Sequence, residues 1–125
     1  MTPLQLIGMT YRLGADPVRH GATDCIGLVV TVLNHYGIQT PVIQRDWYRR
    51  LRRGDTQVFE DELNRWGKKT TKPTIGVVAL CPANMGKGLA VFAEGGWLLF
   101  SGSTVQWRPI GALQDVVFYC QRNST

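Results

Sequence analysis

Residues 24–37 form an apolar run between a helix-capping residue and a glycine, and this run limits the folds open to the chain. Asp24 precedes a stretch that is apolar on nearly every side, and Gly37 ends it. Aspartate is a preferred N-cap residue, and glycine commonly follows a helix end. The β-branched residues are compatible with a strand, but about 12 residues exceed the usual strand length. The sequence therefore predicts a buried helix.

The segments around this helix differ in character. Residues 2–8 combine a cap residue, an early proline and a closing glycine, which predicts a short helix. Residues 11–23 contain glycines and Pro17 and show no periodicity, which predicts a loop. Residues 46–53 and 55–66 are charged and amphipathic, and they predict two further short helices.

The character of the chain changes after Pro73. Short runs rich in β-branched and aromatic residues, separated by turns, predict five strands at 75–80, 89–94, 97–101, 105–108 and 116–120. Helices followed by hairpins are typical of an α+β fold, with the helices packed on one face of an antiparallel sheet. We expect one domain over residues 1–125, helical at about 1–72 and sheet at about 73–121.

The composition excludes several classes of protein. The 125 residues are 44% hydrophobic and 18% charged, as in ordinary globular domains. No apolar run approaches the ~20 residues of a membrane-spanning helix, and the start lacks the basic region of a signal peptide. The three cysteines lack metal-site spacing, so we expect reduced thiols without a metal or cofactor, with Cys81 and Cys120 in or beside strands.

Cys25 is the candidate for nucleophilic chemistry. It lies in the first turn of the predicted helix, where unpaired amides and the positive end of the helix dipole favour a thiolate. A cysteine nucleophile is prepared in this way. Gly27 would let another backbone or a substrate approach closely, and Tyr11 would offer a hydroxyl nearby.

Several motifs occur in a characteristic order over about residues 4–120. They are Tyr11-Arg12, Asp24-Cys25-Ile26-Gly27-Leu28-Val29, Asp46-Trp47, the strand at 76–80, and the strands at 89–101 and 105–110. This pattern resembles the NlpC-type cysteine peptidases of the NlpC/p-sixty superfamily, above all their stand-alone version in phage tails. The resemblance implies a papain-like fold, an ancestral activity on cell-wall peptides, and a site formed by Tyr11, Asp24 and Cys25.

The chain departs from this family at the other two catalytic positions. The resemblance places the general base at Gly88 and the third catalytic residue at Phe100, and neither residue accepts a proton. Only two histidines are available as substitutes. His35 follows Cys25 by ten residues, about 15 Å along the same helix, whereas His20 is near in sequence but lacks an orienting partner.

We therefore expect a catalytically inactive NlpC-type domain. The resemblance implies a structural component of a phage tail tip or baseplate hub, made in the host cytoplasm and located in the virion. Its partners would be other tail hub, baseplate or spike proteins and, weakly, cell-wall peptides. One alternative is an active peptidoglycan endopeptidase with Cys25 as nucleophile and a base from His20 or a neighbouring chain. Another is an inhibitor or immunity-like binder in a cell.

A basic segment is the candidate contact surface. The formal net charge is +5, and Arg49, Arg50, Arg52 and Arg53 cluster beside Trp47. Nearby acids dilute this charge and no nucleic-acid motif accompanies it, so we expect a protein-facing surface and no nucleic acid. The tryptophans favour core positions, but Trp97 follows two glycines at a hairpin and would suit an interface anchor.

Overall fold

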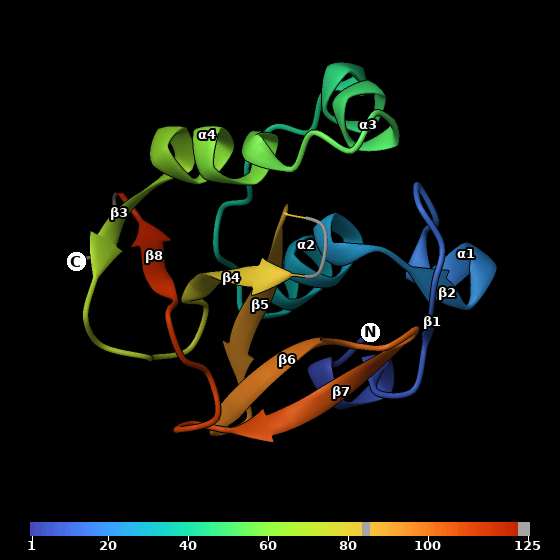
Figure 1. The fold of residues 1–125 in the computed structure, drawn as a ribbon. Helices are drawn as coiled ribbons and strands as arrows, with labels where there is room; N and C mark the ends of the chain where they lie inside the picture. The colour runs from blue at the N-terminus through green and yellow to red at the C-terminus, as the bar shows by residue number, and fades with distance from the viewer. Residues whose placement is uncertain (84–85, 123–125) are drawn as a thin grey trace.

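The computed structural model describes residues 1–83 and 86–122 (Figure 1). The helical elements are the 3₁₀ helix η1 (Pro3–Leu6), α1 (Pro17–His20), α2 (Cys25–His35), α3 (Arg45–Arg52) and α4 (Gln57–Trp66). The strands are β1 (Thr10–Tyr11), β2 (Ala22–Thr23), β3 (Gly67–Thr70), β4 (Val78–Ala83), β5 (Gly86–Ala93), β6 (Gly96–Ser101), β7 (Thr104–Pro109) and β8 (Val117–Gln121). The predicted α+β class is confirmed.

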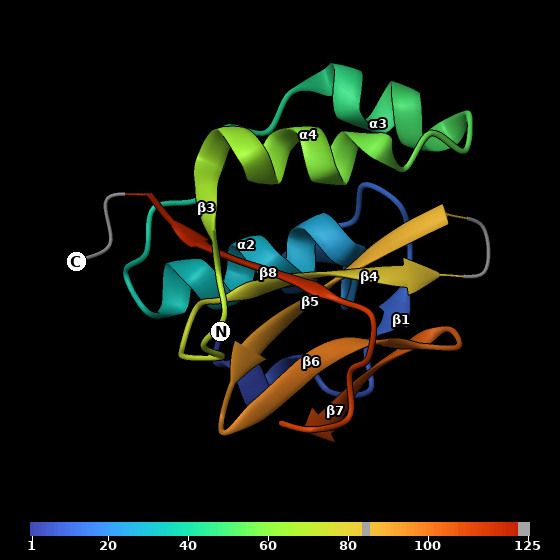
Figure 2. The ribbon, with the colours of Figure 1, turned by 60° about the vertical axis from the view of Figure 1, so that its left-hand side comes forward.

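The described strands form one curled, eight-stranded mixed sheet in the order β2-β1-β7-β6-β5-β4-β8-β3 (Figures 1 and 2). Only β1 and β2 pair in parallel; the other neighbours are antiparallel. All five predicted strands are present, but the prediction of about five in a purely antiparallel sheet was wrong. Because β1, β2 and β3 precede residue 73, the sheet also crosses the predicted boundary between a helical and a sheet part.

The predicted buried helix is confirmed as α2. Asp24 caps it, and its side chains at Leu28, Val32 and Leu33 are fully buried. The helix ends before Gly37, which adopts the left-handed conformation that favours glycine. Helices α3 and α4 also lie where the sequence predicts them. The predicted loop at 11–23, in contrast, contains α1 and β2.

Alternating side chains of β4 and β5 contribute to two cores. The larger core lies between the sheet and helices α2 and α4, and it receives Val78, Leu80, Leu89 and Val91. The smaller core lies on the other face of the sheet and surrounds Trp97, whose indole N–H donates to the Ile110 carbonyl at 3.2 Å. Strands β4 and β5 are therefore packed against hydrophobic side chains on both faces of the sheet.

Candidate functional site

Cys25 lies beside a place where the sheet divides. Strand β5 pairs with β6 only from Ala90 onward, although β5 continues along β4 back to Gly86. The amide of Leu89, just outside the ladder shared with β6, donates a hydrogen bond to the Cys25 sulfur. The first residue of α2 is thereby fixed against β5.

The surroundings of the Cys25 sulfur favour the neutral thiol. Burial, with a smaller contribution from the negative charge of Asp24, raises the pKa of Cys25 to about 11. Hydrogen bonds from the backbone amides of Leu89 and of Cys25 itself lower the pKa, but they do not balance the burial. The position of Cys25 at a helix start, which the sequence predicted to favour a thiolate, does not lower the pKa here, because desolvation exceeds the effect of the backbone amides.

Tyr11 and Phe100 complete the surroundings of the sulfur. The pKa of Tyr11 is raised by burial and by its proximity to Cys25 and Asp24, which places its hydroxyl near both groups. Its ring packs edge-on against Phe100, with the ring centroids 5.1 Å apart. Gly88 directly precedes the Leu89 amide that contacts the sulfur. Tyr11, Cys25, Gly88 and Phe100, four of the five positions that the resemblance singles out, thus lie near one another from β1, α2, β5 and β6.

Asp24 is a buried carboxylate that joins three segments. Its two oxygens accept the backbone N–H groups of Gly14 and Gly27, each at 2.7 Å, and the Tyr48 hydroxyl lies close enough to interact with its charge. Burial, followed by the charge of Asp24, raises the pKa of Tyr48. Sequence reasoning missed Gly14 and Tyr48, because neither lies at a fixed spacing from Cys25.

Neither histidine of the chain is among the groups that act on Cys25. His20 ends α1 and is exposed, and its Nδ1 accepts the backbone N–H of Asp16 at 2.8 Å. His35 ends α2, and its ring packs edge-on against Tyr36 with the centroids 4.8 Å apart. The described part of the chain therefore places no imidazole at the sulfur.

The other two cysteines are half-buried thiols of the sheet, as predicted. Cys81 lies in β4 opposite Gly88, and burial raises its pKa to about 11, with a further contribution from Cys25. Cys120 lies in β8. All three cysteines are free, and the described residues contain no cluster of side chains suited to a metal ion.

The predicted contact surface is only partly accessible. Trp47 and Trp97 are 5% and 0% exposed, so they are core residues, and their prediction as contact residues was wrong. Arg50 is half-buried and pairs with Asp55 at 2.8 Å and Asp61 at 3.0 Å. Arg49, Arg52 and Arg53 are exposed, so the accessible part of this surface consists of guanidinium groups.

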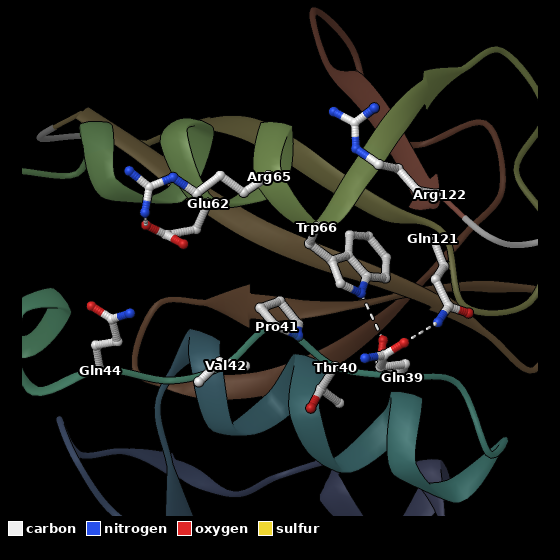
Figure 3. A pocket seen from close by; sticks show the side chains of 10 residues that line it. All are labelled: Gln39, Thr40, Pro41, Val42, Gln44, Glu62, Arg65, Trp66, Gln121 and Arg122. Atoms are coloured by element: carbon white, nitrogen blue, oxygen red, sulfur yellow. Dashed lines mark hydrogen bonds and ion pairs between the residues drawn. The ribbon is translucent and has the colours of Figure 1, made fainter.

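A separate pocket of about 380 Å³ lies between the segment after α2, the end of α4 and the end of β8 (Figure 3). Its polar groups are largely bound to one another: the Trp66 indole N–H donates to the Gln39 carbonyl at 2.6 Å, and the Gln121 amide donates to the Gln39 side chain. These bonds fasten the segment after α2 to the sheet. The pocket does not include Cys25.

No protein-family model, curated protein or solved structure matches the chain. Every helix within residues 1–83 and 86–122 is too short or too polar to span a bilayer, in agreement with the expectation from the sequence. The resemblance to NlpC-type peptidases therefore rests on the sequence motifs alone.

Proposed function

We propose that the chain is a catalytically inactive NlpC-type, papain-like domain that serves as a structural component of a phage tail tip or baseplate hub. The α+β fold supports this assignment, since a helix bearing Cys25 packs against the strands that follow it in the chain. The convergence of Tyr11, Asp24, Cys25 and the start of β5 also supports it, because the resemblance names these positions independently of the coordinates.

The surroundings of the Cys25 sulfur are the main support for the proposal that the domain has no peptidase activity. Peptide hydrolysis by a thiol needs a group that takes the thiol proton and later protonates the leaving amine. The resemblance puts Gly88 and Phe100 at the two positions where such groups would act, and burial raises the pKa of Cys25 to about 11. A domain without this chemistry acts through its surface, by contacts with hub, baseplate or spike proteins.

Digestion of purified peptidoglycan tests the loss of activity. We expect the turbidity of a peptidoglycan suspension to fall no faster with the wild type than with the Cys25→Ala variant, while an active cell-wall hydrolase clears the same suspension. Clearing by the wild type that Cys25→Ala abolishes would contradict the proposal. It would instead establish the active endopeptidase, with Cys25 as nucleophile.

The structural role has its own test. We expect mass spectrometry of purified tails from the phage that encodes the chain to find it as a stoichiometric component. Tails that are complete without this chain would exclude a place in the virion, and a binder that acts inside the cell would then be the better account.

A further inference from the structure

Helix α3 presents its arginines in two different ways. Arg50 is bound to Asp55 and Asp61, which tie α3 to the start of α4. Arg45, Arg49 and Arg52 have the spacing i, i+4 and i+7, which places them along one face of the helix. Together with Gly14 and Tyr48, these three arginines line a pocket of about 420 Å³.

The charge of this arginine pocket is not neutralised within the described part of the chain. No carboxylate there lies within 4 Å of the guanidinium groups of Arg45, Arg49 or Arg52, and all three residues are exposed. Asp46, the acidic residue of α3, is not among the residues that line the pocket. Three unpaired guanidinium groups around one hollow are suited to bind several negative charges.

The wall of the pocket is held in place by the candidate site. Gly14 donates its backbone N–H to Asp24, and the Tyr48 hydroxyl lies near the same carboxylate. Because Asp24 is buried and caps α2, the loop and the helix that bear the pocket are fixed relative to each other. Such a fixed arrangement lowers the entropy lost when a ligand binds.

We propose that the arginine pocket binds an acidic segment of a partner protein. This inference rests on the proposed function, since it specifies the partner of a domain that acts by protein contacts. The rise along α3 is about 6 Å from Arg45 to Arg49 and about 4.5 Å from Arg49 to Arg52. Alternate side chains of an extended peptide are about 6–7 Å apart. Aspartate or glutamate at alternate positions therefore matches the interval from Arg45 to Arg49, and the long arginine side chains can spread to cover the shorter interval to Arg52.

The same surface is poorly suited to nucleic acid. Binding of single strands relies on aromatic side chains that stack on bases. Trp47 is in the core, and Tyr48 is half-buried, so neither ring offers a free face for stacking.

Fluorescence anisotropy with a labelled Gly-Glu-Gly-Glu-Gly-Glu-Gly peptide tests this proposal on the full chain. We expect the wild type to bind this peptide and not the same peptide with Gln in place of Glu. Charge reversal by Arg45→Glu/Arg49→Glu should weaken binding at least about tenfold. The matched control, Lys68→Glu/Lys72→Glu, makes the same change in net charge at exposed lysines outside the pocket, and it should bind as the wild type does.

Three results would overturn the proposal. An equal loss in both double variants would show an effect of net charge alone. A thymidine tetranucleotide that binds more tightly than the Glu peptide, and loses this binding in Arg45→Glu/Arg49→Glu, would show a phosphate site. Complete displacement of the peptide by inorganic phosphate at the same concentration of negative charge would show the same. If the wild type does not bind the peptide, the pocket is not a site for acidic segments. That result would leave the peptidoglycan and tail-composition tests of the proposed function unaffected.

Discussion

Asp24 caps helix α2 and also links this helix to other segments of the chain. The residue is 1% exposed, and its carboxylate accepts hydrogen bonds from the loop at Gly14 and from the first turn of α2 at Gly27, close to the Tyr48 hydroxyl of α3. A buried carboxylate is stable only when such donors surround it. Its removal leaves two backbone donors without their acceptor.

Replacement of Asp24 by alanine should therefore destabilise the fold far more than loss of an ordinary cap. We expect Asp24→Ala to lower the free energy of unfolding by about 2–4 kcal/mol. Asp16→Ala is the matched control, because Asp16 caps α1 by accepting from Val18 at 2.9 Å but is exposed. It should cost about 0.5–1 kcal/mol. Urea denaturation measures both, and equal losses would refute the joining role of Asp24.

At the level of single residues, the sequence could predict which positions matter but not their environments. Cys25 does begin a helix, as its local sequence indicates. Its raised pKa depends on β5, which lies more than 60 residues further along the chain, so no local pattern reveals it. The burial of Trp47 and Trp97 likewise depends on packing between distant elements, and their arginine and glycine neighbours gave a misleading signal.

Helix α2 and strand β2 meet at a junction that only glycine permits. A Cβ atom at Gly27 would overlap the Thr23 hydroxyl and would lie 3.4 Å from Oδ1 of Asp24. Thr23 is fully buried, and its hydroxyl donates to the Asp24 carbonyl at 3.1 Å. The close approach of Gly27 therefore serves this internal contact, whereas the sequence left open an approach by another backbone or by a substrate.

Alanine at position 27 distinguishes packing from helix propensity. Gly→Ala within a helix ordinarily stabilises by about 0.5–1 kcal/mol. We expect Gly27→Ala to destabilise by about 1–3 kcal/mol instead, because the buried Thr23 must move. Gly111→Ala, where a Cβ meets nothing within 4 Å, should change stability by less than about 0.5 kcal/mol. Thermal unfolding compares the two, and a stabilised Gly27→Ala variant would contradict this description of the junction.

The elements that sequence patterns predicted well are the long ones. Helices α2, α3 and α4 and the five strands after Pro73 each carry enough residues to show a periodic or continuous apolar pattern. Strands β1 and β2 have two residues each, too few for any alternation. Strand β3 is a polar edge strand with exposed Lys68 and Lys69, which protects the edge but hides the strand from a hydrophobic pattern.

At the scale of the whole molecule, the curled sheet brings the candidate site together. Strands β6 and β5 separate beyond the pair Leu99 and Ala90, and α2 places Cys25 against β5 just past that point. Tyr11 reaches the site through β1, which pairs with β7 at the same end of the sheet. The sequence motifs had singled out Tyr11 and Cys25 as candidates. The sequence could not predict the curl of the sheet, because curl depends on pairing across the whole molecule.

The central claim is that the described part of the chain places no imidazole at the Cys25 sulfur and that the thiol stays protonated near neutral pH. A thiol with a pKa of about 11 is ionised in only about one molecule in ten thousand at pH 7. Because the pKa is raised, the reactive thiolate increases tenfold with each unit of pH until the pH approaches 11. A catalytic base would instead produce thiolate near neutral pH.

The rate of alkylation of Cys25 as a function of pH tests this claim most directly. A variant with Cys81→Ser and Cys120→Ser leaves Cys25 as the only thiol, and the same variant in urea reports the unfolded thiol, with a pKa of about 8.5. We predict that the rate for the folded protein is far below that in urea at pH 7 and still rises at pH 10. A rate that levels off below about pH 8.5 in the folded protein would contradict the claim, since it would show a thiolate stabilised for attack.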